Sequence, residues 1–150
     1  MIEYYKNILD KKTKQKVFNY VKKEVKDLGE DYPCFQTNPD LHIKPEMKEF
    51  VDIVSKYAEP YTIRKMWCVC SIGDAFAWHD HSKYKYSFVY FLHNPDKVGT
   101  MFKKPSKHNN KVTYSKGDEN TMIKFDASLT HSPPNTYERI KRYTIAFDVI

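Results

Sequence analysis

The segment Trp78-His79-Asp80-His81 decides the fold prediction, because it combines an extended pattern with two potential metal ligands. Successive side chains of a strand point to opposite faces, so His79 and His81 share one face while Asp80 lies on the other. Two imidazoles from one strand can occupy neighbouring positions around a metal ion. A bare His-x-His pair is a weak signal, since most such histidines face solvent or only form hydrogen bonds. The sequence on either side of the pair therefore decides what it means.

The chain changes its character close to residue 62. Upstream, apolar residues at spacings of three and four predict one helix between Thr13 and Gly29 and a second from Pro45 to just before Pro60. The intervening segment, 31–43, contains turn-forming residues without periodicity and is predicted to be a loop. Downstream, turn signals separate short strand-like runs at 62–72, 84–92, 111–114, 121–125 and 142–149.

This order of elements predicts a single α+β domain over residues 1–150. The helical part covers 1–60, and the strands of 62–149 are expected to form a small β-barrel or jelly roll on which the N-terminal helices pack. A chain of 150 residues is long enough to bury one hydrophobic core. Aromatic residues make up 15% of it, which also favours β structure because such side chains suit a pleated, half-buried surface.

Charge and cysteine content restrict the class of protein. The formal charge is +6, which we interpret as a solvated lysine-rich face because no standard nucleic-acid motif accompanies it. Three cysteines without a regular framework argue against a secreted disulfide scaffold, and Cys68 and Cys70 are expected to be buried on one strand face. The sequence shows no signal peptide and no apolar run that could span a membrane, so we predict a cytoplasmic protein without membrane contact.

His131 is the third histidine with a distinctive context. It lies far from the first pair in sequence, but a closed β-barrel can bring its segment alongside them. Three ligands on one side of a metal ion leave the opposite positions open for oxygen, cosubstrate and substrate. Non-heme Fe(II) oxygenases need this arrangement.

Several segments beyond residue 62 share a family pattern. A strand ending at Phe125 is followed by His131, Arg142-x-Thr144 opens the last predicted strand, and the sequence Gly99-x-x-Phe102 lies between the two metal motifs. In order and spacing, these segments resemble the 2-oxoglutarate/Fe(II)-dependent oxygenase superfamily. The resemblance covers about residues 62–149 and is carried by the combination of motifs rather than by any one of them.

The resemblance implies both a fold and an activity. The fold is a double-stranded β-helix, a jelly roll of the cupin-like type, with Fe(II) held by His79, His81 and His131. The activity is that of a dioxygenase, which hydroxylates a substrate with molecular oxygen and converts 2-oxoglutarate to succinate and CO2. The substrate is a protein side chain, a nucleic acid or a small metabolite, and the segments 35–42 and 103–110 are the expected rims of the site.

The resemblance also implies how 2-oxoglutarate is held. Arg142 receives the distal carboxylate, since a guanidinium stays charged and offers a planar pair of N–H donors. Thr144 has the same phase on the strand and adds a hydroxyl donor. Tyr90 is expected to form a hydrogen bond with the cosubstrate. Arg139 is the competing arginine, because it also follows the third histidine closely.

One position departs from the family pattern, in which the residue at His81 is Asp or Glu. A neutral imidazole there gives the metal less charge compensation. Asp80 could replace it through a local bulge, or the vacancy could hold a halide as in related halogenases. Two alternatives stay open: a cupin-type three-histidine metal dioxygenase, whose first motif matches Gly73 and the His-x-His pair, and a catalytically inactive binding module on the same fold.

Overall fold

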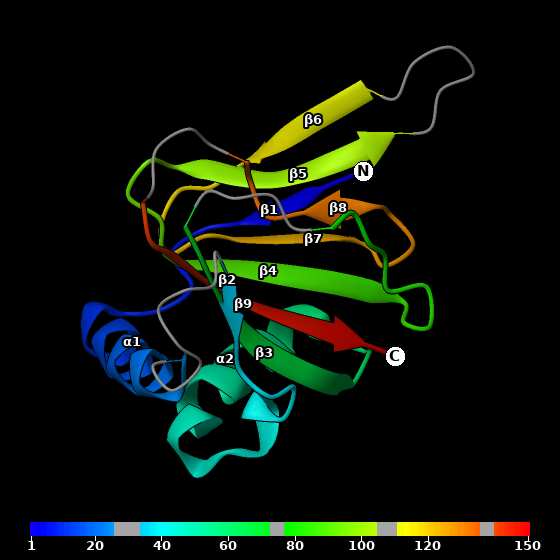
Figure 1. Ribbon diagram of the computed structural model, residues 1–150. Coiled ribbons are helices and arrows are strands. Elements are labelled where there is room, and N and C mark those ends of the chain that lie inside the picture. Colours follow the sequence, from blue (N-terminus) through cyan, green and yellow to red (C-terminus); the bar gives the residue numbers. More distant parts are fainter. Residues whose placement is uncertain (26–33, 73–76, 105–110, 136–139) are drawn as a thin grey trace.

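In the computed structural model, which describes residues 1–25, 34–72, 77–104, 111–135 and 140–150, the helices lie in the first part of the chain and most strands follow them (Figure 1). The helices are α1 (Lys11–Val25), α2 (Lys48–Ala58) and two short 3-10 helices at Leu41–Ile43 and Pro45–Met47. The strands are β1 (Glu3–Tyr5), β2 (Cys34–Gln36), β3 (Ile63–Ser71), β4 (Tyr86–His93), β5 (Val98–Lys104), β6 (Lys111–Lys116), β7 (Met122–Asp126), β8 (His131–Ser132) and β9 (Arg142–Val149).

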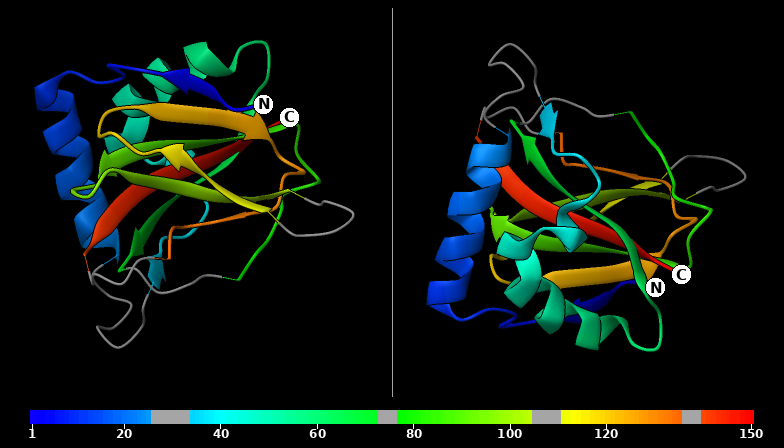
Figure 2. Two further views of the ribbon diagram at one scale, coloured as in Figure 1. Left: turned by 90° about the horizontal axis from the view of Figure 1, so that it is seen from above. Right: turned by 90° about the horizontal axis from the view of Figure 1, so that it is seen from below.

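The named strands pair into two antiparallel sheets. The larger has the order β1-β7-β4-β9-β3-β2, and the smaller has the order β6-β5-β8. An isolated antiparallel bridge between His79 and His131 adds the His79 segment to the free side of β8. The helices cover one face of the larger sheet and the smaller sheet lies over the other (Figures 1 and 2).

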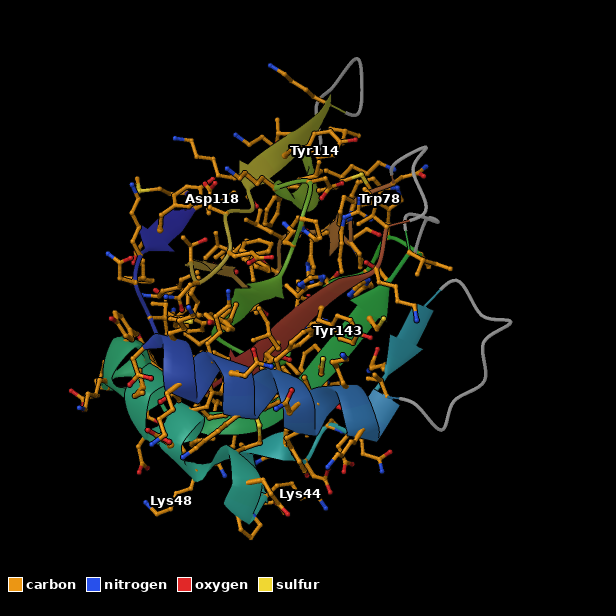
Figure 3. All side chains as sticks on the ribbon, turned by 90° about the vertical axis from the view of Figure 1, so that its left-hand side faces the viewer. Lys44, Lys48, Trp78, Tyr114, Asp118 and Tyr143 are labelled. Atoms are coloured by element: carbon orange, nitrogen blue, oxygen red, sulfur yellow. The ribbon has the colours of Figure 1, made fainter. Side chains whose placement is uncertain are left out.

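Strand alternation assigns each face of the larger sheet its partner. On β9, the odd-numbered residues join the helices in one hydrophobic cluster, and Tyr143 packs edge-on against Phe18 of α1 at 5.2 Å between ring centroids (Figure 3). The even-numbered residues Arg142, Thr144 and Ala146 face the smaller sheet. The central strands β3, β4 and β9 therefore each contribute one set of side chains to the helix-covered core and one set to the space between the sheets.

That space contains a cavity of about 440 Å³. Its walls combine residues of both sheets, and its apolar lining includes Val89 and Phe91 from β4 and Ala146 from β9. Histidines lie in its wall together with Arg142, so the fold places imidazoles and a guanidinium around the same cavity.

Most of the predicted elements are confirmed, and β9 has the predicted bounds of 142–149. The first helix begins at Lys11 rather than Thr13, because Asp10 Oδ1 accepts a hydrogen bond from the Thr13 N–H at 2.7 Å and caps the helix. The predicted stop at Gly29 lies outside the described residues. Cys68 and Cys70 are buried on the helix-facing side of β3, as predicted.

The predicted loop at 31–43 is wrong in part, since it contains β2 and a 3-10 helix. The strands β1, β5 and β8 were also not predicted, because their pairing partners rather than their own patterns define them. Gly99 in β5 has a packing reason: a Cβ there would lie 2.2 Å from the Ser115 carbonyl oxygen of β6. Among the described residues, no helix combines the length and hydrophobicity that a membrane crossing requires.

Candidate metal centre and its cavity

His79 and His131 are brought together by direct backbone pairing. The His131 N–H donates to the His79 carbonyl at 2.9 Å, and the His79 N–H donates to the His131 carbonyl at 3.2 Å. Residues paired in this way in an antiparallel bridge point to the same face, and the two imidazole centroids lie 4.5 Å apart. The strand pairing thus places two potential ligands side by side although they are distant in sequence.

His81 joins the pair through strand alternation and one further backbone contact. Its N–H donates to the Ala127 carbonyl at 2.7 Å, which ties the segment to the chain just before β8. The His81 ring centroid lies 5.2 Å from that of His79 and 5.0 Å from that of His131. One potential ligand atom from each of the three residues lies within 4.8 Å of the other two. The structure therefore brings all three predicted ligands to one place.

Each of the three imidazoles has its Nδ1 next to a hydrogen-bond acceptor. His79 Nδ1 lies 2.9 Å from the Ala77 carbonyl oxygen, and His131 Nδ1 lies 2.8 Å from the Leu129 carbonyl oxygen. His81 Nδ1 lies 2.9 Å from the Asp148 carboxylate.

Carbonyl and carboxylate oxygens only accept hydrogen bonds, so in all three rings Nδ1 carries the proton. The Nε2 atoms are then left with their lone pairs, which is the form that binds a metal ion. This donor set fits a divalent transition-metal cation.

Burial favours the same ligand form at His131. The side chain is 6% exposed, and burial lowers the pKa of His131 from 6.5 to about 4, with the neighbouring histidines adding to the effect. The imidazole is therefore neutral at neutral pH, which a metal ligand has to be.

Asp80 points away from this cluster, as the alternation predicted. It is exposed, and its Oδ1 accepts hydrogen bonds from the Ser82 N–H, at 3.0 Å, and from the Ser82 hydroxyl. These hydrogen bonds hold the pKa of Asp80 below its usual range. The described backbone contains no bulge that would bring Asp80 to the histidines in place of His81.

Arg142 and Thr144 line the same cavity, but Arg142 already has an anionic partner. Its Nε donates to Asp96 Oδ1 at 3.0 Å, its Nη2 contacts Asp96 Oδ2, and its Nη1 donates to the Ile140 carbonyl at 3.1 Å. Burial is the largest single influence on Asp96 and raises its pKa, but the hydrogen bonds from Arg142 and from the Val98 N–H, together with the arginine charge, lower the pKa overall. The arginine lies where the sequence predicted it, and its charge is compensated from within the protein.

Tyr90 does not reach the cavity, which removes it from the set of predicted cosubstrate contacts. It is fully buried on the helix-facing side of β4, its hydroxyl donates to Asn120 Oδ1 at 2.8 Å, and its ring packs against Phe50 of α2. Its neighbours Val89 and Phe91 line the cavity instead. The reason is strand parity: a residue between two cavity-facing positions of a strand points the other way.

The predicted rims are described in part. Gln36 and Pro39 line the cavity from the 35–42 segment, which supports its predicted position. Most of the basic rim at 103–110 lies outside the described residues, and so does Arg139.

Three charged residues of the cavity region were not predicted as site residues: Asp96, Asp148 and Lys65. Only Asp148 had a usable signal in the sequence, because it has the same parity on β9 as Arg142 and Thr144.

Comparison with known proteins gives a clear result for the fold. No family model and no curated protein matches the sequence. A prolyl hydroxylase from Trichoplax adhaerens, solved with a hypoxia-inducible-factor peptide fragment, matches over 99% of this chain and 83% of its own, with a TM-score of 0.69 and 14% identity. The non-heme α-ketoglutarate-dependent epimerase SnoN from nogalamycin biosynthesis matches 99% of this chain and 77% of its own, with a TM-score of 0.78 and 10% identity.

A third similar structure is HygX from Streptomyces hygroscopicus, solved with nickel and 2-oxoglutarate bound. It covers 99% of this chain and 82% of its own at a TM-score of 0.69 and 9% identity. This chain therefore has the fold of the 2-oxoglutarate-dependent oxygenases, with mixed helices and antiparallel sheets. At such identities the similarity establishes the fold alone.

Proposed function

We propose that this chain is a non-heme Fe(II), 2-oxoglutarate-dependent dioxygenase, built on a double-stranded β-helix formed by its two sheets. The observation that carries the proposal is the histidine cluster, in which all three Nδ1 atoms are held by acceptors and all three Nε2 atoms are left for one metal ion. His79, His81 and His131 would hold Fe(II). The neighbouring folds with iron or with 2-oxoglutarate bound support this choice of cofactors.

The bound metal and cosubstrate supply the oxygen chemistry: one atom of O2 enters a C–H bond of the substrate, the other enters succinate, and CO2 is released. The protein's own contribution is position and exclusion of water. Val89, Phe91 and Ala146 contribute to the apolar lining of the cavity. Arg142 and Thr144 would hold the distal carboxylate of 2-oxoglutarate, because they line the same wall and together offer N–H and O–H donors.

Asp96 modifies how the cosubstrate would bind. It contacts Arg142 along the edge formed by Nε and Nη2. A second carboxylate arriving at the same guanidinium therefore meets a charge that is already neutralised. We infer that the distal carboxylate of 2-oxoglutarate competes with Asp96 for Arg142, so binding of the cosubstrate requires this internal pair to loosen.

The substrate would be oxidised at the histidine end of the cavity. Among the similar folds, the prolyl hydroxylase was solved with a peptide and HygX was solved with hygromycin B. A protein side chain, a nucleic acid or a small metabolite therefore remain the substrate classes to screen.

A visible charge-transfer band tests the proposal. Under anaerobic conditions, Fe(II) and 2-oxoglutarate together should give this band with the parent chain, and oxygen should then yield succinate. His131→Ala should lose the band, because it removes a buried ligand. His93→Ala is the matched control, since His93 lies outside the cluster and is half-exposed. A band that persists in His131→Ala would overturn the assignment.

A cupin-type metal dioxygenase that uses three histidines and no 2-oxoglutarate is the second candidate. Two observations favour it: all three ligands are neutral imidazoles, and Arg142 is paired with Asp96. The same experiment separates the candidates. Metal binding without any effect of 2-oxoglutarate on the spectrum would favour the cupin-type enzyme, and absence of metal binding would favour an inactive binding module.

A further inference from the structure

Asp148 is a fully buried carboxylate beside the candidate metal centre. It lies near the end of β9, where its direct cross-strand partners are Lys65 of β3 and Ser87 of β4. Its position continues the cavity-facing parity of Arg142 and Thr144. The sheet register therefore places this carboxylate next to His81 Nδ1.

The contacts of Asp148 are specific. His81 Nδ1 donates to Oδ1 at 2.9 Å and is also 2.9 Å from Oδ2. The Ser87 hydroxyl donates to Oδ1 at 2.6 Å. The Lys65 ammonium is more distant, at 3.9 Å from Oδ2, and its side chain is 34% exposed. The histidine and the serine are thus the close partners, while the lysine lies near the outside of the group.

The three histidines differ in what they donate to. His79 and His131 donate to neutral backbone carbonyls, whereas His81 donates to a carboxylate. A hydrogen bond to an ionised acceptor is about twice as strong as a neutral one, and it makes the imidazole a more basic ligand. His81 is also the residue that stands where related enzymes have an acidic ligand.

We propose that Asp148 is the positioning residue that supplies, through His81, the negative charge that a centre of three neutral imidazoles lacks. This inference rests on the metal site of the proposed function. Asp148 fixes the His81 tautomer so that Nε2 is available to the metal. Its buried negative charge offsets part of the metal's positive charge, with the His81 imidazole lying between the two.

A purely structural role for Asp148 makes a different prediction. In that case its contacts with Ser87 and His81 only join β9 to β4 and to the His81 segment. Loss of the carboxylate charge would then lower the stability of the protein and leave the affinity for a metal ion unchanged. Metal affinity, measured apart from activity, therefore distinguishes the two roles.

The central test is Co(II) affinity of the purified chain, measured by competition with a chromophoric chelator. Asp148→Asn keeps the shape of the side chain and removes its charge, and it should weaken Co(II) binding about 10- to 100-fold. Asp52→Asn is the matched control, because it removes an exposed carboxylate on α2, and its affinity should equal that of the parent. Thermal unfolding without metal shows whether each variant is folded.

His81→Asp places a carboxylate directly at the centre and provides a second background. It should bind Co(II) at least as tightly as the parent. In this background Asp148→Asn should no longer weaken binding, because two facing carboxylates repel each other and the relay through an imidazole is gone. Equal weakening in both backgrounds would overturn the inference, because the effect of Asp148 on the metal would then not pass through the His81 imidazole.

Lys65→Met tests the same idea without altering the buried carboxylate. Without the Lys65 ammonium, the negative charge of Asp148 is compensated less, and its effect on His81 is stronger. Co(II) affinity should therefore rise severalfold. No gain would count against the inference even if Asp148→Asn failed to fold. A parent chain that binds no metal would overturn the proposed metal site itself. An unchanged Co(II) affinity in Asp148→Asn would overturn only the role of Asp148.

Discussion

The two ends of the cavity differ in how their charges are arranged. At the histidine end, every Nδ1 is held by an acceptor behind it, so three lone pairs are presented without an internal competitor. At the arginine end, the Arg142 guanidinium is compensated by Asp96. The first end therefore presents lone pairs suited to a cation, whereas a ligand carboxylate at the second end would have to compete with an internal one.

Both ends are organised by the same face of β9. Arg142 opens the strand and Asp148 lies one residue before its end, so the two charged residues are six positions apart, or about 20 Å of extended chain. Each charge has its own partner from another segment, Asp96 for the arginine and His81 for the aspartate. One strand thus sets the distance between the two ends and leaves their chemistry independent.

The largest effect is expected from Arg142→Ala. It should weaken 2-oxoglutarate binding by roughly 3–5 kcal/mol, more than a hundredfold, because one member of a buried charge pair is lost. Metal affinity should stay close to that of the parent. Arg142→Lys should restore little, since an ammonium lacks the planar pair of donors. Calorimetric titration of 2-oxoglutarate into the Ni(II)-loaded chain measures the cosubstrate affinity of both variants. Unchanged affinity would place the distal carboxylate elsewhere, with Lys65 as the next cation of the cavity wall.

The histidine end should be sensitive to acid in the absence of metal. The folded state lowers the pKa of His131 from 6.5 to about 4, so between these values the unfolded chain binds a proton that the folded chain does not. The free energy of unfolding should therefore fall as the pH drops from 6.5 to 4, by about 3 kcal/mol at most. Urea unfolding across this range, with a chelator present, measures the slope. His131→Gln should flatten it, and an equal slope in this variant would assign the acid sensitivity to other groups.

Asp96→Asn tests whether Asp96 competes with 2-oxoglutarate for Arg142 or instead orients Arg142 for the cosubstrate. Removing the internal carboxylate charge should strengthen 2-oxoglutarate binding about tenfold and lower the stability of the metal-loaded chain without cosubstrate, because the buried Arg142 then loses the negative charge next to Nε and Nη2. Titration and thermal unfolding of the same preparation check both changes. Weaker binding would mean that Asp96 orients Arg142 for the cosubstrate and does not compete with it.

Asp80→Ala should have the smallest effect. The side chain is exposed and bonded to Ser82, so metal affinity should change less than twofold and stability by a few tenths of a kcal/mol. Chelator competition and thermal unfolding are sufficient to check this. A loss of metal binding comparable to that of His131→Ala would show that the segment rearranges around the metal.

The sequence predicted the elements and residues whose patterns are local. Alternation in the 78–81 segment correctly placed His79 and His81 on one face, and parity placed Arg142 and Thr144 on the cavity side of β9. The position of His131 beside this pair was inferred from a family pattern, because it depends on which strands become neighbours.

The same dependence explains what the sequence did not predict. Asp96 lies in a turn 46 residues before Arg142, and Asp148 lies 67 residues after His81, so neither pair follows from local periodicity. Tyr90 was assigned to the cosubstrate although its neighbours Val89 and Phe91 have the cavity-facing parity. The tyrosine hydroxyl suggested a contact with the cosubstrate, but the alternation of β4 points Tyr90 away from the cavity.

A crystal structure of the chain with Ni(II) and 2-oxoglutarate tests the central claim most directly, because nickel holds the complex without turnover. We expect one metal ion on the Nε2 atoms of His79, His81 and His131, with the distal carboxylate of 2-oxoglutarate at Arg142 and Asp96 displaced from its present contact. A metal ligated by Asp80 with His81 turned away, or no metal at the three histidines, would contradict it.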